Sequence, residues 1–304
     1  MGKPRSFTSW AGSVLCGLAM AAALPASAAT IQIVPGTTME MQAPDGQCVI
    51  EPSVNQFDAA YFATMNKMYV GTNNLLALFI DCNVLASMRQ GIAQPITYWT
   101  IVLLPLSGGQ VMSAAGYTRA QVIEEMSKAA AGADMQAYLD GQKGSIQQRI
   151  NETMQGGYQM GQLKSLGILA KDDAGIYSGL LMSQTLAGVP EQIACVIGMT
   201  LINGYVVTVN IYRPYVNTET YTDMVADMQA DMAALVSANG GVVAPPAASA
   251  SPIPGFTPSM DAGATTGADS SKTLLVIVLG VGVVLAGGLV GFFLTRRKPG
   301  QDNS

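Results

Sequence analysis

Histidine is absent from all 304 residues of the sequence. This absence excludes a Ser-His-Asp triad, a Cys-His dyad, a histidine proton shuttle and every zinc site that needs an imidazole ligand. A glycine-rich phosphate loop and a G-x-S-x-G nucleophile motif are missing as well. A hydrolase that works with carboxylates alone remains an option, but nothing fixes the separation of acidic pairs such as Glu124 and Glu125. We therefore expect a non-enzymatic protein without a cofactor or a metal site.

Charged residues are also scarce, at 12% of the chain, whereas a soluble domain has about 25%. Such a deficit indicates that part of the chain does not face water, and apolar stretches at both ends account for much of it. The 15 basic residues are outnumbered by 20 acidic ones. Nucleic acid is therefore excluded as the main partner, because it requires a basic face.

Residues 1–28 are predicted to be a secretory signal peptide. Lys3 and Arg5 make a positive amino-terminal region, residues 11–24 are apolar, and 26–28 read Ala-Ser-Ala, a typical cleavage site. The apolar run of 14 residues is too short to span a bilayer. The alternative is an uncleaved amino-terminal anchor.

Residues 273–295 are predicted to form one transmembrane helix. The 21 residues of 274–294 carry no charge, and as a helix they would rise about 31 Å, the thickness of the hydrocarbon core. A basic cluster follows at 296–298, and positive residues stay on the cytoplasmic side of a membrane. We expect a single-pass type I protein of the bacterial inner membrane, with its bulk in the periplasm and residues 296–304 as a cytoplasmic tail.

Gly287 and Gly291 form a small-xxx-small pair within this helix. The pair predicts a possible homodimer through the membrane segment. The alternative is that glycine is simply common in membrane helices. Residues 240–272 are rich in Pro, Ala, Ser, Gly and Thr and are predicted to be a disordered linker with a coil span of about 30 Å.

The remaining residues, 29–239, are numerous enough for one domain with its own core. Between Thr30 and Ser271 there are 19 acidic and 9 basic residues, a difference of −10. This balance favours solubility and cationic partners, and it opposes contact with anionic lipid headgroups.

The residue pattern of this domain alternates between strands and helices. Strands are predicted at 31–34, 47–50, 75–82, 96–106, 166–171, 176–184, 194–202 and 205–212, and helices at 55–70, 118–131 and 219–236. Asn203-Gly204 predicts a tight hairpin, and Thr218 lies near the start of the last helix. The buried face predicted for that helix is Tyr221, Met224, Met228, Met232 and Leu235. Antiparallel hairpins with helices before and after them predict an α+β fold, an antiparallel sheet with helices packed on it.

A strand pair joined by Asn203-Gly204, followed by a long terminal helix, resembles the PsbP-like α+β sandwich over the last 75 or so residues of the domain. The whole body also resembles uncharacterised secreted or membrane-anchored proteins of Gram-negative bacteria, in which a stretch like 74–89 follows an early Gly-x-Cys such as Gly46-Gln47-Cys48. PsbP-like domains mostly serve as docking or assembly modules. The resemblance implies no functional residue.

Three cysteines follow the predicted signal peptide. Cys48 and Cys82 lie at the ends of predicted strands, and an oxidising compartment favours a disulfide between them. Cys195 lies in the middle of an apolar strand and is predicted to be a buried filler. A reactive thiol is the alternative, but no histidine or nearby cation would lower its pKa.

Acidic residues recur at every fourth position along the last predicted helix, at Asp223, Asp227 and Asp231. They are either a docking face for a basic partner or a solvated helix face. Residues 132–165 are rich in Gly, Gln and Met and are predicted to be a flexible insertion, in which only 145–154 could hold a helix. Long polar insertions of this kind often serve as binding loops. Copper binding through methionine is the alternative for this segment.

These observations predict a membrane-tethered periplasmic interaction or assembly module that binds another protein. The alternative is a periplasmic carrier of a hydrophobic ligand or a metal ion. A closed apolar cavity under the sheet would favour the carrier, and a flat surface patch would favour docking.

Overall fold

The computed structural model describes residues 28–92, 94–107, 109–132, 134–153, 158–186 and 188–243. The strands of this part are β1 (Ala28–Val34), β2 (Thr37–Gln42), β3 (Gln47–Val49), β4 (Asn73–Asp81), β5 (Trp99–Ser107), β6 (Gln110–Val111), β7 (Tyr158–Lys171), β8 (Ile176–Leu186), β9 (Val189–Ile202) and β10 (Tyr205–Pro214). The helices are α1 (Gln56–Tyr69), α2 (Cys82–Arg89), α3 (Arg119–Gly132), α4 (Met135–Thr153) and α5 (Glu219–Ala238).

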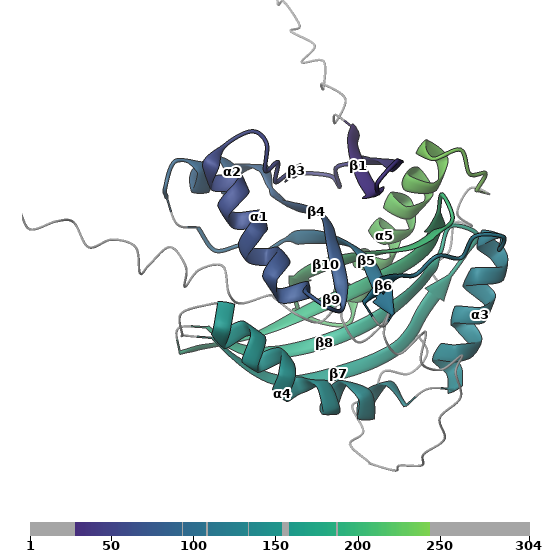
Figure 1. Cartoon of the computed structure of the whole chain (residues 1–304). Coiled ribbons are helices and arrows are strands. Elements are labelled where there is room, and N and C mark those ends of the chain that lie inside the picture. Colours follow the sequence, from purple (N-terminus) through teal and green to yellow (C-terminus); the bar gives the residue numbers. More distant parts are fainter. Residues whose placement is uncertain are drawn as a thin grey trace, which may run out of the picture.

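One large antiparallel sheet organises these elements, with the strand order β3-β4-β5-β10-β9-β8-β7 and β6 added to β5 (Figure 1). A separate hairpin is formed by β1 and β2. The turn predicted at Asn203-Gly204 joins β9 and β10, and both residues have positive φ, 49° and 83°. A two-residue hairpin loop of this kind requires that conformation. The α+β prediction is therefore confirmed.

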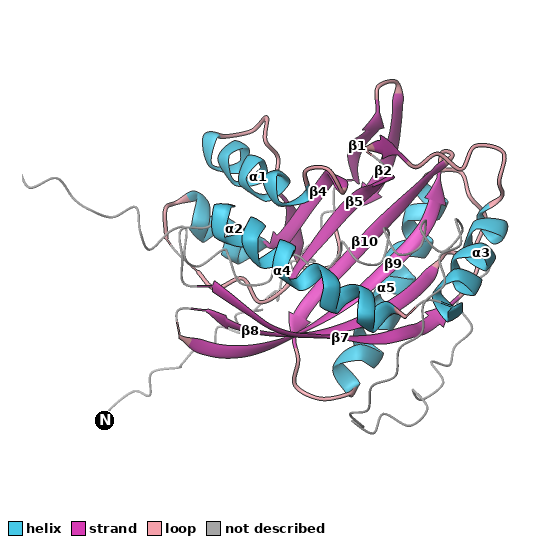
Figure 2. Cartoon of the chain, turned by 60° about the horizontal axis from the view of Figure 1, so that its bottom comes forward, coloured by secondary structure: helices cyan, strands magenta, loops and turns pink. Residues whose placement is uncertain are grey.

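Each face of the large sheet has its own apolar core. One core lies under α1, α2, α3 and α4 and contains Tyr61, Met68, Trp99, Leu139 and Ile146 (Figure 2). We call this side the four-helix face. The other core lies under α5 and the β1–β2 hairpin, and we call that side the α5 face. Alternate residues of each central strand point to opposite faces, so most positions of β5 and β10 are buried, and most of the buried residues are apolar.

Helix α5 packs through the stripe that the sequence predicts, because Tyr221, Met224, Met228, Met232 and Leu235 are all at most 3% exposed. Its close approach to the sheet depends on Gly198 of β9. A Cβ at that position would lie 2.7 Å from the Met228 sulfur. The start of α5 is capped by Asn217, whose side chain accepts a hydrogen bond from the Glu219 amide at 2.9 Å, and not by Thr218.

Three other helices begin at side-chain caps. Asn55 accepts a hydrogen bond from the Asp58 amide at the start of α1. Thr118 and Gln121 form the reciprocal capping box of α3, with distances of 2.9 and 3.3 Å. Asp81 caps α2, so Cys82 begins a helix rather than ending the strand predicted at 75–82.

The prediction of a flexible insertion at 132–165 with a helix only at 145–154 is wrong. Residues 135–153 form the 19-residue helix α4, and residues 158–165 begin the 14-residue strand β7. Helix α4 contains Gly141 and Gly144, which lower helix propensity, and its hydrophobic periodicity is weak. It is stabilised by tertiary contacts that the local sequence does not reveal, in particular buried Leu139, Ile146 and Ile150.

The predicted signal peptide, most of the linker, the transmembrane helix with Gly287 and Gly291, and the cytoplasmic tail lie outside the described residues. Within the described ranges, no helix combines the length and the apolarity that crossing a membrane requires.

Candidate functional site

The acidic residues of α5 occupy three different environments. Asp223 and Asp227 are exposed, while Asp231 is half-buried. Since the opposite stripe of α5 is fixed in the core, the three carboxylates are carried by a rigid element. The stripe is therefore a defined surface feature, although its members differ in their neighbours.

Asp227 is held by the end of β10. The Arg213 guanidinium donates a hydrogen bond to its carboxylate at 2.5 Å, and the same guanidinium lies 4.4 Å from the centre of the Tyr98 ring. An arginine that stacks on an aromatic ring while it pairs with a carboxylate has little rotational freedom left. Arg213 thus fixes the position of Asp227 on the surface.

Asp231 lies one helical turn further along α5. Burial, the largest cause, together with the carboxylates of Asp227 and Asp45 raises the pKa of its carboxyl group to about 6, against the opposing effect of Arg213. Asp45 lies before β3, far away in the sequence, so no helical spacing could have predicted its presence. We call Asp45, Asp227 and Asp231, together with Arg213 and Tyr98, the acidic cluster.

The acidic cluster can attract a positively charged group, because its three carboxylates outnumber its one guanidinium. It is not arranged as a chelate. Within the described ranges, no group of three or more His, Cys, Asp or Glu side chains is placed to hold a metal ion. Calcium would need six or more oxygen ligands.

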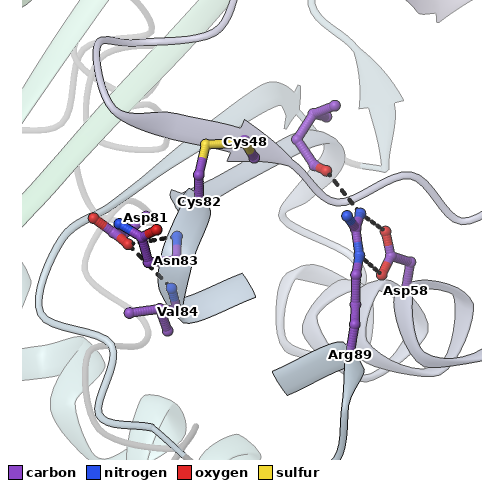
Figure 3. The surroundings of a disulfide bond; sticks show 8 residues. Cys48, Asp58, Asp81, Cys82, Asn83, Val84 and Arg89 are labelled. Atoms are coloured by element: carbon purple, nitrogen blue, oxygen red, sulfur yellow. Dashed lines mark hydrogen bonds and ion pairs between the residues drawn. A yellow bond between two sulfur atoms is a disulfide. The ribbon is translucent and has the colours of Figure 1, made fainter. Parts of the chain in front are cut away.

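The predicted disulfide between Cys48 and Cys82 is confirmed, with a Cα–Cα distance of 4.9 Å (Figure 3). It links the edge strand β3 to the first residue of α2, 34 positions along the chain. Cys195, in contrast, is a free and fully buried thiol. Burial raises its pKa, which makes a thiolate nucleophile at this position unfavourable.

An ion pair beside the disulfide was not foreseen from the sequence. Arg89 at the end of α2 donates two hydrogen bonds to the Asp58 carboxylate, from Nε at 2.9 Å and from Nη2 at 2.5 Å (Figure 3). Asp58 is completely buried, and the Glu51 amide also donates to it at 2.9 Å. Burial opposes ionisation of Asp58, yet the hydrogen bonds from Arg89 and Glu51 leave its pKa below the ordinary value.

The four-helix face also contains buried polar groups that the sequence did not single out. Trp99 stacks on Tyr212 with ring centroids 4.8 Å apart. The Trp99 indole N–H and the Tyr61 hydroxyl are both buried without a hydrogen-bond partner among the described residues. Both side chains belong to the apolar core of the four-helix face, so bulky aromatic groups fill part of that core.

The structure thus brings Asp227 and Asp231 together with Asp45, joins Cys48 to Cys82, and leaves Asp223 on its own at the surface. No protein-family model, curated protein or solved structure matches this chain.

Proposed function

We propose that this chain is a non-enzymatic, membrane-tethered module of the bacterial envelope that binds another protein through the exposed side of α5. The observation that carries the proposal is the rigid presentation of Asp223 and of Asp227, a member of the acidic cluster, on one helix. A helix anchored by seven buried side chains positions charges more reproducibly than a loop does. The partner surface is expected to be rich in Lys or Arg.

The charge of the whole body supports this partner class. The 19 acidic and 9 basic residues between Thr30 and Ser271 give a difference of −10, which speeds association with cationic surfaces. The sequence-based expectation of a periplasmic body on a type I membrane anchor supplies the location.

No described feature favours the alternative of a carrier. Side chains from three helices occupy the four-helix face, including Met65 of α1, Met126 of α3 and Ile150 of α4, all at most 4% exposed. A ligand-binding cup would leave such positions open. The docking role is therefore the one we retain.

The test compares the full-length chain with Asp223→Lys, a change that reverses one exposed charge. Chains are purified from gently solubilised membranes, and co-purifying proteins are quantified. Glu152→Lys on α4 is the matched control, because Glu152 is also exposed on a helix but lies far from α5 in the sequence.

We expect a partner that is retained by the parent and by Glu152→Lys but is lost from Asp223→Lys, more strongly at low salt. A partner that stays bound to Asp223→Lys would place the docking surface elsewhere. If the parent retains no partner, the interaction role is wrong.

A further inference from the structure

Side-chain amides cover the outer edge of β7. Gln136 of α4 donates to the Leu163 carbonyl at 2.8 Å and accepts from the Ser165 amide at 3.0 Å. Gln147, three turns further along α4, donates to the Tyr158 carbonyl at 3.3 Å and accepts from the Met160 amide at 2.6 Å. Backbone groups that would otherwise be free on an edge strand are thereby paired, which protects the edge from pairing with another chain.

The outer edge of β2 is covered in the same way. Asn239 at the end of α5 donates to the Glu40 carbonyl at 2.8 Å and accepts from the Glu40 amide at 3.0 Å. Asn203 in the β9–β10 turn donates to the Thr38 carbonyl at 2.7 Å. Two further edge residues are thus paired by amides from distant parts of the chain.

The remaining long edge, that of β1, has no such cover. Thr30 lies directly opposite Glu40, and Gln32 lies opposite Thr38. Two opposite residues of an antiparallel pair point their N–H and C=O groups either both toward each other or both away from each other. Glu40 and Thr38 bond outward to Asn239 and Asn203, so Thr30 and Gln32 turn their own N–H and C=O groups away from β2. Both residues are exposed, and among the described residues none bonds to these outward groups.

The composition of β1 does not block pairing. After the predicted cleavage behind Ala28, residues 29–34 contain no charged side chain and no proline, and four of the six are β-branched, namely Thr30, Ile31, Ile33 and Val34. Proteins usually protect an exposed edge with Lys, Pro or a covering segment. In Figures 1 and 2 the β1–β2 hairpin lies at the margin of the body.

We propose that the β1 edge pairs with the β1 edge of a second copy of this chain. Antiparallel pairing of two identical edges is symmetric about a two-fold axis and closes into a dimer. It would join two hairpins into a continuous four-stranded sheet with the order β2-β1-β1-β2.

The second copy is the favoured occupant because of where the rest of the chain leaves the body. The Asn239–Glu40 hydrogen bonds place the end of α5 beside the β1–β2 hairpin, and the described residues end soon afterwards, at Val243. The 33 residues of 240–272, predicted from their composition to be a linker, would span about 30 Å as a coil, so two copies anchored side by side would hold their β1 edges within reach. The choice of a second copy as the occupant rests on the membrane tether of the proposed function. The observation that the β1 edge is unpaired does not depend on that tether.

The test uses the full-length chain in native membranes with Thr30→Cys and a short bis-maleimide cross-linker. Gln159→Cys on β7 is the matched control, since Gln159 is exposed on the edge that α4 covers. The parent chain measures the background from its own cysteines. We expect a covalent homodimer with Thr30→Cys only, several-fold above the parent.

Two second-site changes show whether the edge itself makes the contact. Gln32→Pro removes an outward N–H that the hairpin does not use, and Gln32→Lys adds a charge to the edge. Added to Thr30→Cys, each should return the cross-link to background while protease resistance of the body is unchanged. If the Gln32→Pro variant loses its protease resistance, the cross-linking of the Gln32→Lys variant decides whether the edge makes the contact.

Three outcomes overturn the proposal: background cross-linking of Thr30→Cys in the membrane fraction, a cross-link to a protein of different mass, or a homodimer that survives both Gln32 changes. The last result would assign the dimer to the membrane segment. Release of the chain from membranes by carbonate would instead contradict the tether, and a Thr30→Cys homodimer in the released fraction would still support the β1 edge.

Discussion

The two faces of the large sheet are stabilised in different ways. On the α5 face one helix of 20 residues packs through regularly spaced methionines, with Gly198 allowing close approach. On the four-helix face the cover consists of four helices with three kinds of specific link. The disulfide joins β3 to α2, the Asp58–Arg89 ion pair joins α1 to α2, and the α4 glutamines bond to β7. One face depends on periodic apolar packing, and the other depends on contacts between residues far apart in the sequence.

This difference implies different sensitivities to substitution. Apolar packing fails when a polar group enters it, whereas a specific link fails when one of its two partners is removed. The predictions below test that distinction, beginning with the largest effect.

Met228→Asp should prevent folding of the domain. Met228 is completely buried against Gly198, so the new carboxylate would be unpaired in an apolar core at a cost of about 5 kcal/mol. Thermal unfolding of the purified chain measures the effect. Thr222→Asp, on the exposed side of the same helix, is the control and should melt like the parent. A Met228→Asp chain with a normal melt would mean that α5 is not docked on the sheet.

Removing the disulfide should have the next largest effect. Replacing Cys48 and Cys82 by Ala frees a loop of 34 residues and should lower the free energy of unfolding by roughly 3–4 kcal/mol. Denaturant titration of the parent with and without a reductant should reproduce the same loss. If neither treatment changes the free energy of unfolding, the disulfide does not stabilise the four-helix face, and the proposed difference between the two faces is wrong.

Arg89→Met should lower stability by about 3 kcal/mol at pH 7, since it leaves the Asp58 carboxylate buried without its cation. In the parent, the lowered pKa of Asp58 means that this stabilisation is present above the ordinary pKa of the group and is lost as the pH falls through the lowered value. Asp58→Asn combined with Arg89→Met should recover part of the loss. Equal stability of the single and double variants would show that the buried charge is not the cause.

The same distinction explains what could be predicted from the sequence. The stripe of α5 and the Asn203-Gly204 turn follow from local spacing, and both are confirmed. Only the second half of α4, at 145–154, could be predicted as helix, because Gly141 and Gly144 obscure a helix whose Gln136 and Gln147 bond to β7. At the acidic cluster the α5 carboxylates were visible as a repeat, but Asp45 and Arg213 reach them only through the tertiary fold.

Asp231→Asn should have the smallest effect and the opposite sign. Because burial raises the pKa of Asp231 to about 6, the folded domain retains this proton at a pH where the unfolded chain has lost it. Stability therefore falls as the pH rises from about 4 to 6, and the full penalty of the ionised group is present above that range. Asparagine removes the charge, so the variant should be more stable than the parent by about 1–2 kcal/mol at pH 7 and equal to it near pH 4.

Unfolding by urea at pH 4, 5, 6 and 7 measures this difference. Asp223→Asn is the matched control, because Asp223 is an exposed carboxylate on the same helix and its replacement should not change the pH dependence. A gain that is the same at every pH would assign the effect to helix propensity instead of to the buried charge. A gain that is nearly absent at pH 4 and grows as the pH rises to about 6 would assign the effect to the buried carboxylate. The α5 face, stable through apolar packing, would then lose part of that stability by keeping a carboxylate at the acidic cluster, as a docking surface for a cationic partner requires.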